Sequence, residues 1–231
     1  MSITIELDKY DNDGAILYKT DKIEFNPGVT ILVGCNGSGK TTLMNQIDRK
    51  HHYSNSNIIS NIFTCCDTYK EMDRMMYDPR SYDYSMDKVA TMICSSEGER
   101  IAIGLTSAFD WMWAQCRNSE IHSIFMLLDS LDSGLDVSNL RMIYNVIEES
   151  VGIAKNDFST DLYVIISAND YALVENHKCL DIYTGETITF KDFNEYSEFA
   201  MKSTEIKEKR YEKETDDNND NDDDYGSWRE R

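Results

Sequence analysis

The chain has 231 residues, of which 41% are hydrophobic, so it is long enough to bury the core of one α/β domain or two small ones. Its formal net charge is −19, and segment 212–231 accounts for only −6 of that charge. An acidic body of this kind disfavours broad contact with a nucleic-acid backbone, although it leaves room for a small basic patch.

Composition also indicates where the protein works. The six cysteines are scattered without a C-x-x-C pair, which favours free thiols in a reducing cytoplasm. We expect neither a signal peptide nor a membrane span, because the N-terminus lacks a basic, long apolar leader and no apolar run reaches spanning length. Abundant Asn, Asp, Ile, Lys and Tyr beside two prolines are typical of AT-rich genomes, including those of viruses such as phages.

The first part of the chain predicts a group of short strands. Residues 2–7 alternate apolar and polar side chains, which indicates a half-buried strand. Residues 15–18 and 22–25 favour further strands, with turn-forming residues on either side. An antiparallel arrangement therefore leads into the apolar, β-branched run 29–33, which predicts a more buried strand.

The stretch Gly34–Thr42 has the pattern G-x-x-x-x-G-K-T, the phosphate-binding loop. A predicted strand precedes it and apolar residues at helical spacing follow it, which disfavours the alternative of an ordinary glycine-rich turn. Its glycines let backbone N–H groups surround a phosphate chain, and the helix start adds partial positive charge. We expect this loop to bind ATP through Asn36, Gly37, Ser38, Gly39, Lys40, Thr41 and Thr42.

Two residues of the loop have specific expected roles. Lys40 would reach the β- and γ-phosphates, and the Thr41 hydroxyl would ligate Mg²⁺.

A strand is expected at residues 58–66. Residues 69–92 are irregular, aromatic and Met-rich, and we interpret them as a small, partly helical insertion.

A second motif, Cys94–Arg100, is followed by a predicted helix with one apolar face. A serine and a glycine at a helix start form an anion site, although the same residues are also common in a simple capping box. A third motif, Ile124–Asp129, is an apolar run that ends in a carboxylate. It predicts a buried parallel strand whose Asp129 lies at the carboxyl end and holds the Mg²⁺ shell.

The rest of the chain predicts two more sheet elements and a tail. Residues 162–167 favour a buried strand that leads to Asn169, and residues 179–190 favour a closing hairpin. A short helix is expected at 192–201. The sequence then becomes charged and Asp/Asn-rich, so we expect one domain at 1–203 and a disordered acidic tail at 204–231.

Three stretches in this order resemble the ABC-type ATPase family, particularly members related to DNA-repair and chromosome-condensation ATPases. Gly34–Thr42 is similar to its Walker A motif and Ile124–Asp129 to its Walker B motif. Ser95–Glu99 is similar to its signature motif, with Ser96 and Gly98 at matching positions. Over residues 2–190 the resemblance implies an α/β, P-loop ABC-ATPase-like core: a mostly parallel sheet, N-terminal antiparallel strands and a small helical insertion.

The resemblance also implies an assembly and exposes departures from the family. Family subunits pack head to tail, so Ser96 would cap the γ-phosphate of the partner's ATP in an ATP-dependent homodimer. The family's catalytic Glu after the Walker B Asp is Ser130 here, its γ-phosphate His is Asn169, and its first signature glycine is Glu97. Ser130 is a poor base at neutral pH, which leaves Asp132 or Glu97 as substitutes.

The residues expected to bind phosphate and Mg²⁺ are thus retained, whereas the family's catalytic Glu and His are replaced. The expected function is an ATP- and Mg²⁺-dependent, slowly hydrolysing homodimer that engages a second protein. One alternative is a non-hydrolysing regulatory or inhibitor module, and another is a DNA-processing ATPase, which the charge disfavours. A transporter subunit would need a larger helical insertion than this chain provides.

Overall fold

The computed structural model describes residues 1–10, 14–51, 57–64 and 97–219. Its centre is a six-stranded sheet of order β4-β5-β6-β3-β7-β8, in which all strands but β8 run parallel. A separate antiparallel pair, β1-β2, lies beside it. The bounds are β1 Ile3–Glu6, β2 Lys22–Phe25, β3 Gly28–Val33, β4 Ile58–Thr64, β5 Ser123–Asp129, β6 Asp161–Ser167, β7 Cys179–Asp181 and β8 Thr187–Ile188. The predicted α/β class with a mostly parallel sheet is confirmed.

The two faces of the sheet build two hydrophobic cores. Every residue of β5 is buried, and because successive strand side chains point to opposite faces, they divide between the two cores. Ile124, Met126 and Leu128 belong to one core, and Phe125 and Leu127 belong to the other. A strand covered on both faces needs a continuous apolar run, which is the pattern that identified this segment in the sequence.

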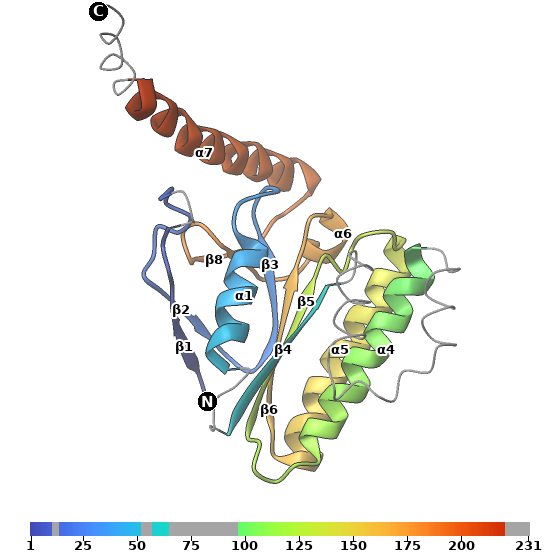
Figure 1. The fold of residues 1–231 in the computed structure, drawn as a ribbon. Coiled ribbons are helices and arrows are strands. Elements are labelled where there is room, and N and C mark those ends of the chain that lie inside the picture. Colours follow the sequence, from blue (N-terminus) through green and yellow to red (C-terminus); the bar gives the residue numbers. More distant parts are fainter. Residues whose placement is uncertain (11–13, 52–56, 65–96, 220–231) are drawn as a thin grey trace, which may run out of the picture.

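Helices cover both faces. Helix α1 (Lys40–His51) packs on the core that also holds β1 and β2, whereas α4 (Glu97–Cys116) and α5 (Val137–Phe158) pack on the other. Figure 1 shows α1 on one side of the sheet and the α4–α5 pair on the opposite side. Because the helices run antiparallel to their strands, the first turns of α1 and α4 and the carboxyl ends of β3, β5 and β6 meet at one sheet edge.

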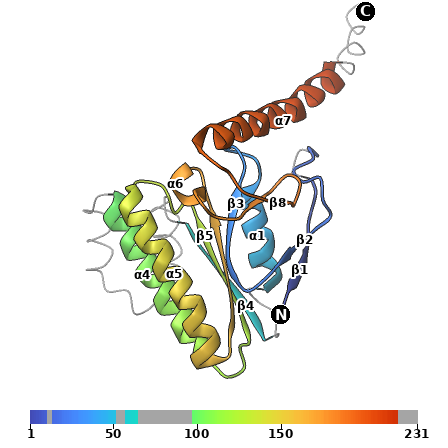
Figure 2. The ribbon, with the colours of Figure 1, turned by 180° about the vertical axis from the view of Figure 1, so that it is seen from behind.

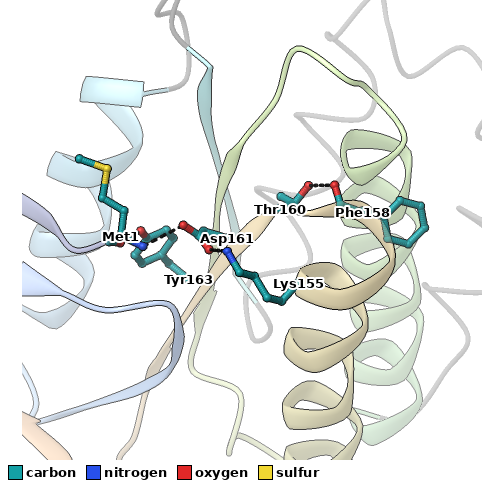
Figure 3. A network of polar contacts seen from close by, with 6 residues as sticks. All are labelled: Met1, Lys155, Phe158, Thr160, Asp161 and Tyr163. Carbon is teal, nitrogen blue, oxygen red and sulfur yellow. Dashed lines mark hydrogen bonds and ion pairs between the residues drawn. The ribbon is translucent and has the colours of Figure 1, made fainter.

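A polar network closes the opposite edge of the sheet. The Asp161 carboxylate accepts hydrogen bonds from Lys155 Nζ at 2.7 Å and from the Met1 amine at 2.9 Å, and Tyr163 donates its hydroxyl to the Met1 carbonyl (Figure 3). Partial burial of Asp161 raises the pKa of its carboxyl, but the two cationic donors outweigh burial and hold the pKa below its ordinary value. The network ties the first strand region to the start of β6.

The C-terminal helix α7 (Phe193–Asn219) is longer than the sequence predicts, and it follows the short helix α6 (Tyr171–Val174) and the β7-β8 pair. We expected a helix ending at Met201 and a disordered tail from residue 204, whereas α7 continues through 204–219. The segment is rich in Glu and Lys, which favour helix and place Glu198 four residues before Lys202 and Glu205 four residues before Lys209.

Tertiary contacts also hold α7 in place. In Figures 1 and 2 it lies across the sheet edge where β3 ends and α1 begins.

The insertion predicted at 69–92 and the tail at 220–231 fall outside the described residues. Within the described part, no helix is both long and apolar enough to cross a bilayer.

Candidate functional site

The phosphate-loop motif joins β3 to α1, as its sequence predicts. Gly37 and Gly39 have φ values of +77° and +109°, a region that L side chains rarely adopt. At Gly39 an added Cβ would lie 3.2 Å from the ring of Tyr18, whose hydroxyl donates to the Gly39 carbonyl at 2.9 Å. Tyr18 is fully buried, so the core itself fixes the inner side of the loop.

Lys40 is folded back into the loop. Its Nζ donates to the carbonyls of Gly34 at 2.7 Å and Cys35 at 3.2 Å. Burial lowers the pKa of the Lys40 ammonium, and the Cys35 thiol and the nearby carboxylates of Asp132 and Asp129 oppose that effect. Within the described residues this buried cation bonds neutral carbonyls, and an anionic group would be a stronger partner for it.

Asp129 at the end of β5 is held by hydroxyl groups on both carboxylate oxygens. Thr41 donates to its Oδ2 at 2.8 Å, and Ser167 at the end of β6 donates to its Oδ1 at 2.6 Å. The carboxylate is buried, at 4% exposure. One carboxylate between two hydroxyls is an all-oxygen set of the kind that Mg²⁺ prefers.

Ser130 has a left-handed backbone with φ +58°. Its N–H donates to Ser167 Oγ at 2.7 Å, so Ser167 links Ser130 and Asp129 through one hydroxyl. This conformation directs the chain sharply out of β5 and places residue 130 at the wall of the site.

The loop after β6 is held by Asp132. One oxygen of its carboxylate accepts from the backbone N–H groups of Asn169 at 2.5 Å and Asp170 at 2.6 Å. The Asn169 carbonyl in turn accepts from the Tyr196 hydroxyl at 2.9 Å. Burial and the neighbouring carboxylates of Asp132 and Asp170 raise the pKa of Tyr196 to about 12, so its hydroxyl stays protonated as a donor.

These elements surround a cleft of about 280 Å³. Of the residues predicted from sequence, the cleft brings together Asn36, Gly37, Gly39, Lys40, Thr41, Thr42, Asp129, Ser130 and Asn169. Ser38 and Asp132 lie next to it without lining it. Ser38 is buried, and its hydroxyl has no hydrogen-bond partner within the described residues.

The predicted signature motif is only partly described. Ser96 lies outside the described residues. Gly98 is in the first turn of α4, where an added Cβ would lie 3.2 Å from the Gly134 carbonyl oxygen and 3.8 Å from a Leu135 methyl group. The start of α4 therefore packs against the loop that follows Asp129, at the same sheet edge as the phosphate loop but away from it (Figure 1).

Sequence reasoning missed three residues of this site. The sequence places Ser167 only at the end of a strand, because nothing in it shows that this strand lies next to the one that carries Asp129. Tyr18 supports Gly39 from the core. Lys207, in the segment assigned to a disordered tail, donates from Nζ to the Asn36 carbonyl at 3.0 Å.

A comparison with protein families agrees with this geometry. A family model described as an AAA domain matches residues 14–49, the segment that contains β2, β3, the phosphate loop and most of α1. The chain carries a P-loop ATPase-like domain. No curated protein matches the sequence of this ATPase-like domain or of the rest of the chain.

The residues present fit the groups that a P-loop ATPase domain uses. The loop offers backbone N–H groups and Lys40 to a phosphate chain, and Thr41 and Asp129 offer oxygens to Mg²⁺. Bound Mg²⁺ would neutralise phosphate charge. The chain's own contribution is to hold Thr41 and Asp129 in contact before any ligand arrives.

Replacing Asp129 with Asn is expected to weaken ATP binding about 10–100-fold in Mg²⁺ while changing it little in EDTA. The substitution preserves size but removes the charge that would hold the metal. Fluorescence titration with a labelled ATP analogue, in Mg²⁺ and in EDTA, measures both affinities.

Asp136→Asn is the matched control for this substitution. Asp136 caps α5 through a bond from the Asn139 N–H at 2.9 Å, lies outside the cleft, and is replaced by another good capping residue. Equal losses for Asp129→Asn in Mg²⁺ and in EDTA would refute a metal role for Asp129.

Proposed function

We propose that the protein is an ABC-type ATPase that closes as a head-to-tail homodimer on ATP and Mg²⁺, hydrolyses ATP slowly, and thereby engages or releases a second protein. The main support is the site around Asp129: the carboxylate lies ready for Mg²⁺ beside Lys40 and Thr41, while the next residue is Ser130 rather than a carboxylic acid. The site thus offers groups that suit phosphate and Mg²⁺, whereas Ser130 is a poor general base for hydrolysis.

The dimer is part of the proposal because of the expected role of Ser96. In the sequence Ser96 directly precedes Glu97, the first residue of α4, and the first turn of α4 lies apart from the phosphate loop (Figure 1). We therefore expect Ser96 to serve the phosphate loop of another chain and not that of its own. A second copy turned head to tail would bring its Ser96 to the open cleft. Each ATP would then be bound by two chains.

We expect the chain to change from monomer to dimer mass in light scattering when ATP and Mg²⁺ are added, and Lys40→Ala to remain monomeric. Phosphate release by the wild type should be slow. Ser130→Glu should raise turnover at least about tenfold, because it adds a base beside the bound nucleotide.

Ser130→Gln is the matched control for this test. Both substitutions place a long side chain at φ +58°, a conformation that costs about 1–2 kcal/mol for an L residue, so their difference isolates the carboxylate. Brisk wild-type turnover that Ser130→Glu leaves unchanged would contradict the slow-switch proposal. Monomers at saturating ATP would contradict the dimer.

A non-hydrolysing regulatory module is the second candidate. It is favoured by Ser130 and by Asn169, whose backbone N–H and carbonyl are both used to hold its loop. This candidate predicts ATP binding that depends on Lys40 with phosphate release no faster than in Lys40→Ala. The same phosphate-release experiment therefore separates the two functions.

A further inference from the structure

Helix α7 presents one half-buried stripe to the sheet edge. Ser203, Ile206, Lys207 and Arg210 are half-buried at helical spacing, while the residues between them are exposed. Three members of the stripe bond to the main chain at or beside the cleft. Ser203 Oγ accepts from the Cys35 N–H at 2.9 Å, and Lys207 and Arg210 donate to the carbonyls of Asn36 at 3.0 Å and Leu17 at 3.1 Å.

Arg210 fixes the distal end of this stripe. Besides its bond to Leu17, a residue that lines the cleft, its guanidinium lies 5.2 Å from the centre of the Tyr183 ring. A cation over an aromatic face adds attraction to the hydrogen bond. Helix α7 is therefore held at two points along its length, on the phosphate loop and beyond it.

Lys207 lies against Asn36 and Gly37 of the phosphate loop. An added Cβ at Gly37 would lie 3.0 Å from Lys207 Nζ and 3.1 Å from its Cε, so the ammonium rests directly on that glycine. Asn36 and Gly37 both line the cleft. A long, flexible side chain at this place can reach across the glycine to a phosphate in the loop.

A second positive charge would help the cleft to bind a triphosphate. Among the described residues that line it, Lys40 is the sole cation, and Asp129 adds a negative charge. A nucleoside triphosphate would bring several more negative charges. Because Lys207 donates to a neutral carbonyl, a phosphate oxygen would be the stronger partner for its ammonium.

We propose that α7 is a cis-acting arm of the nucleotide site and that Lys207 moves its ammonium from the Asn36 carbonyl to the terminal phosphate of a bound nucleoside triphosphate. The arm thereby favours triphosphate over diphosphate. This inference rests on the proposed ATP binding. It adds a phosphate-binding residue from the same chain, independent of any second copy.

The test compares the affinities of the full chain for a non-hydrolysable ATP analogue and for ADP, both with Mg²⁺. Lys207→Gln should weaken binding of the ATP analogue about 10-fold or more and binding of ADP less than about 2-fold, because one charge-assisted bond to the terminal phosphate is lost. Lys207→Arg should retain the preference for the triphosphate.

Lys209→Gln is the matched control, since it removes the same charge from an exposed position of the same helix. Equal affinities in Lys207→Gln and Lys209→Gln, equal losses for ATP and ADP, or tighter binding in Lys207→Gln would each overturn the inference. The last result would mean that the arm obstructs the cleft. Failure of the wild type to bind ATP more tightly than Lys40→Ala would instead overturn the proposed function.

Discussion

Replacing Lys40 with alanine is expected to weaken ATP binding at least about 100-fold and to eliminate ATP hydrolysis. Lys40 is 7% exposed, and its Nζ lies inside the loop on the carbonyls of Gly34 and Cys35. Alanine would leave the β- and γ-phosphates without this charged donor. Calorimetric titration with ATP and Mg²⁺, together with a phosphate-release assay, measures both effects.

The same substitution should change the melting temperature little. Removing a buried ammonium relieves its desolvation cost, while two loop carbonyls lose a donor, and the two effects oppose each other. Lys50→Ala is the matched control, because Lys50 lies at the other end of α1 and donates to the Glu6 carbonyl. If Lys40→Ala bound ATP as well as Lys50→Ala does, the assigned phosphate site would be wrong.

Replacing Phe125 with alanine is expected to destabilise the fold by about 3–5 kcal/mol. Phe125 is fully buried on β5, and its ring stacks on Tyr163 and His51 with centroids 4.7 Å and 5.4 Å away. It also meets the Phe25 ring in a T-shaped arrangement, with 6.2 Å between centroids. Alanine would leave a cavity that these rings, which come from α1, β2 and β6, cannot all close at once.

Urea denaturation and thermal melting measure this loss. For a chain of this size the melting temperature should fall by about 10 °C. Phe125→Leu should lose clearly less, because it refills most of the volume. A loss below about 1 kcal/mol for Phe125→Ala would show that the rings do not pack as one cluster.

The parts that the sequence predicted correctly depend on short stretches. The loop after β3 is defined by glycines and by a lysine within nine residues, and β5 is defined by its continuous apolar run. Both patterns follow from local requirements. Gly37 and Gly39 adopt positive φ values that favour glycine, and β5 is buried on both faces, which requires apolar residues throughout. Such patterns carry enough information to locate Lys40, Thr41 and Asp129.

The features that the sequence analysis missed, Ser167 in the site and the length of α7, depend on contacts between distant segments. Ser167 meets Asp129 only because β6 lies next to β5, and a lone serine gives no such signal. For the chain beyond residue 204, composition indicates little apolar burial. This part of α7 is held by polar bonds to segments more than 160 positions earlier, such as Lys207 to Asn36, which composition does not encode.

The place of β3 in the sheet has a consequence for synthesis on the ribosome. This strand is flanked by β6 and β7, which are translated more than a hundred residues later. At roughly 5–20 residues per second, the nascent chain exposes the unpaired, apolar β3 for about ten seconds. The emerging polypeptide is therefore a natural client for chaperones during that interval, and the nucleotide cleft can form only after β6 and Asn169 have been translated.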